Sequence, residues 1–289
     1  MMVHPPRHRE AFTLVELLVC IAIIGVFVGL SMPAVQAVRE SARRAKCQSR
    51  MFAISLGLHS YHDRFGSFPI GTTDDAAAIS HGTTGHHHNW IGRMLPQMDL
   101  RLIHEHIDPN VSIYDPANAA VLNLHCPKFH CPSAAVRPEN VSDYAGIHGP
   151  QERPIDAQGR GVFLLNEAVR RDDITDGLSY TAVVAEKISY ESDLGWLSGT
   201  RSTLRCTGGG IEASDDAFQS PPPSALGSIG SYHADGAMVL YGSGEIQLLS
   251  RSVDAEVLRQ IANRADGELP LGWMSIQQQR EQMLQKGRP

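Results

Sequence analysis

The sequence has 289 residues, of which 42% are hydrophobic, and a formal net charge of −6 at pH 7. This apolar content is sufficient for a folded core and therefore excludes a fully disordered chain. The negative net charge excludes a globally basic surface, so we expect no nucleic-acid partner.

Residues 17–38 contain no charged side chain and predict a helix long enough to cross a hydrocarbon core of about 30 Å. Glu16 stands at one end of this run, and an ionised side chain deep in a bilayer costs roughly 2.5 to 3.5 kcal/mol on insertion scales. A cleaved secretory signal is one alternative, although the apolar run is too long and Glu16 is misplaced for it. An ordinary single-span anchor is another, and it leaves the acidic residue unexplained.

Residues 9–19 (REAFTLVELLV) resemble the N-terminal processing motif of type IV prepilins and type II secretion pseudopilins. The resemblance implies that a prepilin peptidase cuts between Ala11 and Phe12 and that the new amine is methylated. It also implies that Glu16 meets the N-terminal amine of a neighbouring subunit and that Pro33 is the helix-kinking proline of many pilins. Ala11 departs from the usual glycine before the cut, which bears on the efficiency of cleavage.

The basic residues around the apolar run give a conflicting signal about orientation. More of them follow the run (Arg39, Arg43, Arg44, Lys46 and Arg50) than precede it (Arg7 and Arg9), which by the positive-inside rule places the following domain in the cytoplasm. The resemblance implies the reverse, because the processing peptidase works on the cytoplasmic face. We follow the resemblance and expect a single-pass protein of the inner (cytoplasmic) membrane, with its head in the periplasm or, after assembly, on the cell surface.

The helical pattern continues past Pro33 to about Arg64 and carries two apolar stripes. The first stripe includes Val35, Val38, Ala42, Ala45, Phe52 and Leu56, and the second includes Cys47, Met51, Ile54, Leu58 and Tyr61. Two apolar faces predict that one contacts the chain's own domain and the other contacts neighbours. Cys47 belongs to the second stripe and is expected to point toward the domain.

Beyond residue 70 the helical period gives way to short apolar runs separated by Gly, Pro, Asn and Asp, which predicts a mainly β domain. We expect strands at residues 161–165 and 180–185, a hairpin over 237–249 and a closing helix over 254–264. Residues 58–69, 89–99, 131–133, 143–146 and 174–179 resemble segments of a large family of pilin-like proteins of planctomycete bacteria, which carry a domain of unknown function. That family ends on a His-x9-Asp-Gly signature, and here His233 is followed by Ser243 and Gly244, so the aspartate is replaced.

Four cysteines lie outside the apolar run: Cys47, Cys126, Cys131 and Cys206. In an oxidising compartment they can form two disulfides, and we favour Cys47 with Cys131 from the helix stripe and Cys126 with Cys206 by elimination. A zinc site built from His125, Cys126, His130 and Cys131 is the alternative, although Pro127 restricts it.

No other sequence pattern predicts a catalytic or metal-binding site. His81, His86, His87 and His88 stand among Gly and Thr and are interpreted as a flexible solvated loop. The sequence has no Gly-x-Ser-x-Gly motif with a base partner, so we expect no catalytic residues, no cofactor and no enzyme activity.

The sequence therefore predicts an α+β, pilin-like fold in which a long N-terminal transmembrane helix packs on a β-rich antiparallel head. The expected divisions are a cytoplasmic leader at 1–11, a helix at 12–65 with 12–35 in the membrane, a head at 66–270 and a polar tail at 271–289. The expected function is a prepilin or pseudopilin-like subunit of a pilus- or type II secretion-like structure, with prepilin peptidase, other pilin-like subunits and membrane lipid as partners. The alternative is a membrane-tethered periplasmic binding or carbohydrate-processing module.

Overall fold

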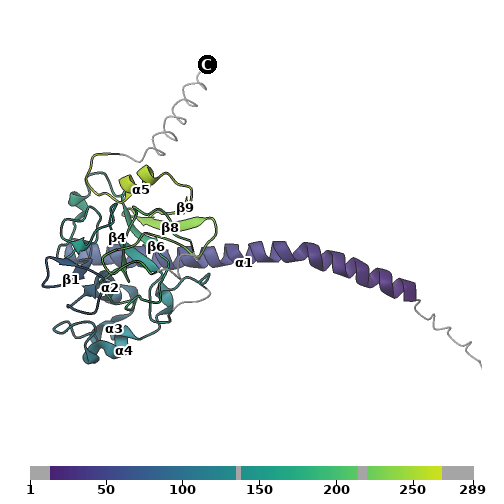
Figure 1. Ribbon diagram of the computed structural model, residues 1–289, viewed down its shortest axis with the longest axis horizontal. Helices are drawn as coiled ribbons and strands as arrows, with labels where there is room; N and C mark the ends of the chain where they lie inside the picture. The colour runs from purple at the N-terminus through teal and green to yellow at the C-terminus, as the bar shows by residue number, and fades with distance from the viewer. Residues whose placement is uncertain (1–13, 135–137, 214–219, 269–289) are drawn as a thin grey trace, which may run out of the picture. The chain divides into compact units, whose positions relative to one another are not determined.

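The computed structural model of the protein describes residues 14–134, 138–213 and 220–268 (Figure 1). The chain divides into two compact units between Arg43 and Arg44. The helix α1 (Leu14–Phe65) contributes to both units, and each unit is described by itself.

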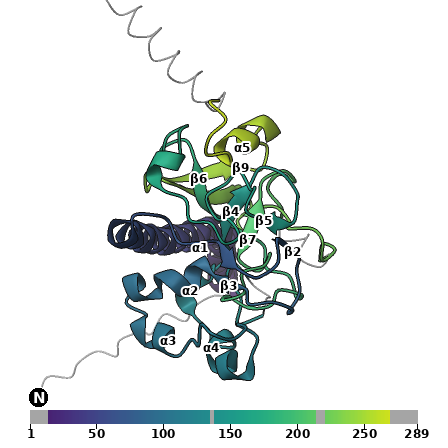
Figure 2. The same cartoon turned by 90° about the vertical axis from the view of Figure 1, so that its left-hand side faces the viewer.

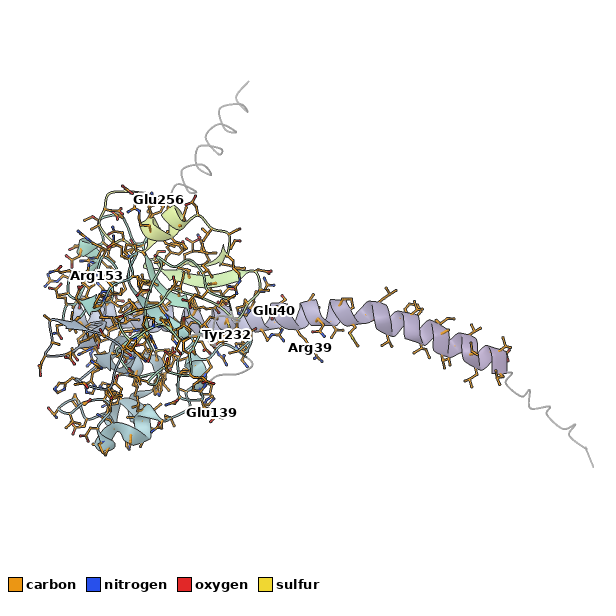
Figure 3. All side chains as sticks on the ribbon, in the orientation of Figure 1. Arg39, Glu40, Glu139, Arg153, Tyr232 and Glu256 are labelled. Carbon is orange, nitrogen blue, oxygen red and sulfur yellow. The ribbon has the colours of Figure 1, made fainter. Side chains whose placement is uncertain are left out.

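The first unit contains the apolar part of α1. Its large hydrophobic side chains from Leu14 to Val38 are all exposed, and Figure 3 draws them as sticks along the helix. Among the described residues, α1 is the one helix that is long and apolar enough to cross a membrane by length and composition. Pro33 lies inside α1, where it has no backbone N–H to donate to the preceding turn.

The second part of α1 belongs to the core of the head. Cys47, Met51, Ile54 and Leu58 are almost completely buried, which confirms that the second stripe faces the domain. Phe52 and Leu56 of the first stripe are more than half exposed. Gly66 ends the helix with a φ of 76° and donates its N–H to the carbonyl of His62, as expected for a glycine that follows a helix.

A five-stranded sheet forms the centre of the head, in the order β7-β4-β6-β8-β9. Its strands are β4 (Tyr144–Gly149), β6 (Ala182–Glu186), β7 (Leu204–Cys206), β8 (Gly236–Tyr241) and β9 (Ile246–Ser250). Three of the pairings are antiparallel, but β4 and β7 run parallel, so the predicted antiparallel head is a mixed sheet. The long connection between β4 and β7 allows this parallel pairing, since parallel neighbours need a crossover.

Helices cover both faces of the sheet, and Figure 2 shows α1 between the sheet on one side and α2, α3 and α4 on the other. Met51 and Ile54 of α1 share one core cluster with residues of the sheet and with Trp90 of α2. On the other face, α5 (Ala255–Ile261) packs Leu258 and Ile261 into a second cluster. The head is therefore a layered α+β domain, as the sequence predicts.

The remaining elements are short. The helices are α2 (Trp90–Met94), α3 (Arg101–Glu105) and α4 (Ala119–Leu122), and the 3-10 turns are η1 (Leu95–Met98), η2 (Pro116–Asn118), η3 (Pro127–Phe129) and η4 (Arg171–Asp173). The small strands are β1 (Thr72–Thr73), β2 (Ala78–Ile79), β3 (His88–Asn89) and β5 (Ile155–Asp156), which pair as β1-β3 and β2-β5.

The sequence predictions for the sheet differ in their outcome. The hairpin is confirmed as β8 and β9, and the strand at 180–185 is confirmed as β6. The strand expected at 161–165 is wrong, because this segment forms only isolated bridges. Its backbone N–H groups at Val162 and Phe163 both bond to the carbonyl of Ile147, and a shared acceptor interrupts the ladder of a regular strand.

The closing helix α5 begins at a side-chain cap. Asp254 Oδ1 accepts a hydrogen bond of 2.8 Å from the backbone N–H of Glu256. Because an N-cap carboxylate satisfies a free N–H group of the first turn, Asp254→Ala is expected to lower the free energy of unfolding by about 1 kcal/mol. Chemical denaturation measures this loss. Asp254→Ser keeps a cap and is the matched control, so an equal loss in both variants would contradict the capping role.

Candidate functional site

The N-terminal segment carries the residues of the predicted processing motif. Ala11 and Phe12 lie outside the described residues. Glu16 lies in the first turn of α1 and is exposed, and Pro33 lies farther along the same helix. The segment therefore offers an apolar helical surface with one acid at its start.

Inside the head, four buried side chains bring their potential ligand atoms within 4.8 Å of one another. We call them the buried cluster: Cys47, Cys131, Glu186 and His233. They come from α1, from the segment between η3 and β4, from the end of β6 and from the segment before β8. Packing of α1 against the sheet thus brings together four residues that are far apart in the sequence.

The distances within the buried cluster are short. Cys47 Sγ lies 3.1 Å from Cys131 Sγ, and Cys131 Sγ lies 3.6 Å from His233 Nε2. His233 Nε2 lies 3.5 Å from Glu186 Oε1. Each of the four residues is at most 2% exposed. The sulfurs, the imidazole and the carboxylate thus face one another in a space without solvent access.

A second set of hydrogen bonds holds the cluster residues in place. Ser133 Oγ lies 3.3 Å from His233 Nδ1, so Nε2 is the ring nitrogen that faces Cys131 and Glu186. Glu186 Oε2 accepts hydrogen bonds from Ser231 Oγ at 2.8 Å and from a backbone N–H at 3.0 Å. Both contacts leave Glu186 Oε1 directed toward the cluster.

Hydrogen bonding polarises the two cysteines. The Cys47 thiol donates to Cys131, which lowers the pKa of Cys131 to about 7 although burial opposes this shift. The same hydrogen bond, with burial, raises the pKa of Cys47. Cys131 is therefore the more acidic of the two thiols.

The structure brings together one of the two predicted cysteine pairs. The sulfurs of Cys47 and Cys131 are 3.1 Å apart, which is longer than the S–S bond of about 2.05 Å. Cys206 Sγ instead contacts Glu152 at 3.5 Å and the carbonyl of Gly227 at 3.3 Å. Both predicted disulfides stay predictions.

The alternative zinc site of the sequence analysis does not form. The rings of His125 and His130 lie with their centroids 4.4 Å apart, but Cys131 Sγ contacts Cys47 and His233 instead. Among the described residues, the buried cluster is the one group of His, Cys, Asp and Glu whose ligand atoms converge. Glu186 is the member that sequence reasoning missed, and its signal is an acid that directly follows four buried apolar residues of β6.

The two parts of the C-terminal signature have separate places. His233 belongs to the buried cluster, whereas Ser243 and Gly244 form the turn between β8 and β9. Gly244 has a φ of 94°, and a Cβ at this position would stand 3.2 Å from Ser55 Oγ of α1. The glycine is therefore needed where the hairpin turn approaches α1.

The histidine-rich segment is not the solvated loop that the sequence predicted. His87 is 1% exposed, and its Nδ1 lies 3.1 Å from Tyr114 Oη. His81 contacts the carbonyl of Ser192 at 2.7 Å, and burial lowers its pKa to about 4. His81, His87 and His88 find polar partners inside the head, whereas the side chain of His86 remains 41% exposed.

A buried ion network lies beside the cluster. Lys187 Nζ, fully buried, donates to Asp193 Oδ2 at 2.6 Å, and Arg205 Nη2 lies 4.0 Å from Asp193 Oδ1. Burial lowers the pKa of Lys187 to about 8, so the ammonium remains protonated at neutral pH. Ser189 joins this network to the cluster, since it contacts Lys187 and Asp143, whose carboxylate accepts the backbone N–H of Cys131.

Comparisons with known proteins yield two matches. A family model described as "Protein of unknown function (DUF1559)" matches residues 36–256, more than half of the chain. A model described as "Prokaryotic N-terminal methylation motif" matches residues 6–32. Both resemblances found in the sequence are thereby confirmed. Searches of curated proteins and of solved structures gave no match.

Proposed function

Because the chain belongs to the family described as protein of unknown function (DUF1559) and begins with a prokaryotic N-terminal methylation motif, we propose that it is a prepilin-like subunit incorporated into a pilus- or type II secretion-like assembly. Its role is structural rather than catalytic. A prepilin peptidase removes the leader, and other pilin-like subunits then pack against the apolar helix.

The observation that carries this proposal is the exposed apolar surface of α1, most of which lies within the segment that the methylation motif matches. From Leu14 to Val38 every large hydrophobic side chain is at least 49% exposed. Such a surface is stable in lipid or against similar helices but not in water. Lateral packing in an assembly gives the surface a partner once the subunit leaves the bilayer.

The orientation of the subunit follows from the position of the motif. A leader that is cut on the cytoplasmic face places the head on the opposite side of the inner membrane, in the periplasm or on the cell surface. The basic residues after the apolar run then lie near the headgroups of the outer leaflet of that membrane, where anionic lipid is an attractive partner.

The mature N-terminus tests the processing step. We expect mass spectrometry of the protein purified from its native membrane to find a chain that begins with N-methylated Phe12. A chain that still begins with Met1 would contradict the proposal and favour the tethered binding or carbohydrate-processing module.

Replacement of Glu16 tests the assembly step. We expect Glu16→Ala to leave membrane insertion unchanged and to reduce incorporation into the assembly at least about tenfold, because loss of a charge-assisted contact in a desolvated interface costs 2 kcal/mol or more. Crosslinking followed by quantification of the co-purified subunits measures incorporation.

Glu40→Ala is the matched control for this experiment. Glu40 is a carboxylate on the same helix, and it pairs with Arg43 at 2.6 Å outside the apolar run. Loss of incorporation in the Glu16 variant alone supports the proposal, whereas equal incorporation in both variants removes Glu16 from the mechanism.

A further inference from the structure

We propose that the buried cluster binds one Zn²⁺ ion through two sulfurs, one imidazole nitrogen and one carboxylate oxygen. Nothing in the proposed assembly function requires this site, which lies entirely within the head. The argument rests on the distances, the burial and the hydrogen bonds of the four ligand residues.

Two distances in the cluster match the edges of a tetrahedral zinc site. Zn–S bonds of about 2.3 Å and Zn–N bonds of about 2.0–2.1 Å separate the two ligand atoms by about 3.6 Å at the tetrahedral angle. Cys131 Sγ and His233 Nε2 are 3.6 Å apart. Nitrogen and carboxylate ligands are separated by about 3.4 Å in the same geometry, and His233 Nε2 lies 3.5 Å from Glu186 Oε1.

The separation of the two sulfurs lies between the value for two thiolates on one zinc ion and the value for a disulfide. Thiolates on one zinc ion are about 3.8 Å apart, and bonded disulfide sulfurs are about 2.05 Å apart. The observed separation of 3.1 Å means that zinc binding moves the sulfurs apart by about 0.7 Å, whereas oxidation moves them together. Four ligand atoms within 4.8 Å of one another favour the first of these changes, because a disulfide uses only two of them.

The carboxylate of Glu186 gives independent support for a bound cation. Its Oε1 atom is buried and accepts no hydrogen bond from the described residues. His233 is the one basic side chain among the described residues with a nitrogen within 4.0 Å of this carboxylate. A carboxylate oxygen that is buried without a hydrogen-bond donor is costly, and a metal ion bound to this oxygen removes the cost.

The surrounding hydrogen bonds resemble the support that metal ligands need. A metal-binding histidine usually bonds through its other ring nitrogen, and Ser133 Oγ contacts His233 Nδ1 at 3.3 Å. Ser231 Oγ donates to Glu186 and accepts the backbone N–H of His233 at 3.1 Å. One serine thus fixes two ligands relative to each other.

The chemical types of the four ligands indicate which metal ion the cluster would bind. Sulfur and imidazole ligands favour zinc over Ca²⁺ and Mg²⁺, which prefer oxygen. Four protein ligands without solvent access are typical of a structural zinc site. Binding deprotonates both thiols and releases their protons, and it ties Cys47 of α1 to the sheet through Glu186 and His233.

The test uses the full chain purified in detergent under anaerobic, reducing conditions. We expect one equivalent of Zn²⁺ per chain by elemental analysis, and a higher melting temperature with Zn²⁺ than with a chelator. Titration with Co²⁺ after zinc removal should give the intense sulfur-to-metal absorption of a tetrahedral thiolate site. Because this band requires sulfur ligands, it separates the cluster from adventitious binding by surface histidines.

Two variants and one matched control complete the test. Cys131→Ser removes one of the two sulfur ligands and should lower the intensity of the sulfur-to-cobalt band at least about twofold. Glu186→Gln should weaken zinc binding by about 10- to 100-fold or more. Cys126→Ser removes a buried thiol outside the cluster and should bind like the unmodified protein. If Cys131→Ser does not fold, the cobalt spectrum and the melting temperature of the unmodified chain still show whether the buried cluster binds zinc.

Three results would overturn the inference. They are a zinc content far below one per chain in reduced protein, a cobalt spectrum without a sulfur band, and a Cys47–Cys131 cross-linked peptide in protein isolated under thiol-blocking conditions. The last result would establish the disulfide instead.

Discussion

Asp193→Asn is expected to lower the free energy of unfolding by about 3–5 kcal/mol, because it leaves the buried Lys187 ammonium without its anion. Both partners of this ion pair are completely shielded from solvent and lie 2.6 Å apart. The second cation, Arg205, is 4.0 Å from the same carboxylate and has no exposed surface. Two buried cations without a carboxylate are much costlier than a lost surface pair.

Equilibrium denaturation, followed through the fluorescence of the buried Trp90 and Trp196, measures this loss. Asp235→Asn is the matched control, because Asp235 also pairs with an arginine, Arg44 at 2.7 Å, but has a side chain that is 58% exposed. We expect the control to change stability by at most about 1 kcal/mol. Equal effects of the two substitutions would contradict a special role for the buried network.

Ile54→Ala is expected to lower the free energy of unfolding by about 2–5 kcal/mol, because it opens a cavity where α1 meets the core of the head. Ile54 is 0% exposed and shares its cluster with residues of the sheet and of α2. The same helix passes close to η1, where a Cβ on Gly57 would stand 2.8 Å from Met98 Cγ. The space around this part of α1 is therefore already filled.

Leu56→Ala is the matched control on the opposite face of the helix. Leu56 is 55% exposed, so its loss should cost less than about 1 kcal/mol by the same denaturation measurement. If Ile54→Ala were as mild as the control, this part of α1 would not belong to the core, and the head would fold without it.

The proposed zinc site, together with the buried ion network that contacts it, would give α1 a second kind of attachment to the head. Ser189 contacts Lys187 at 3.1 Å and Asp143 at 2.9 Å. Asp143 in turn accepts the N–H of Cys131 at 2.6 Å. If assembly extracts the subunit from the bilayer by its helix, as proposed, such polar and metal contacts would transmit force to the head without depending on apolar packing alone.

The sequence by itself determined the features of the fold that depend only on local patterns. The period of Cys47, Met51, Ile54 and Leu58 identifies the buried face of α1, because residues three or four apart share one side of a helix. The turn Gly242–Ser243–Gly244 between two apolar runs identifies the hairpin of β8 and β9. Each of these signals lies within a short stretch of chain.

The tertiary structure alone decided which distant residues meet. Sequence reasoning placed Cys47 and Cys131 together, but it did not connect them with Glu186 or His233, and it placed His87 in solvent. The parallel pairing of β4 with β7 was equally hidden. These contacts arise from the packing of α1 on the sheet and from the order of the strands, and neither leaves a periodic signal in the chain. A charged or imidazole side chain becomes a ligand only when the packing of other segments removes water and brings its partners near.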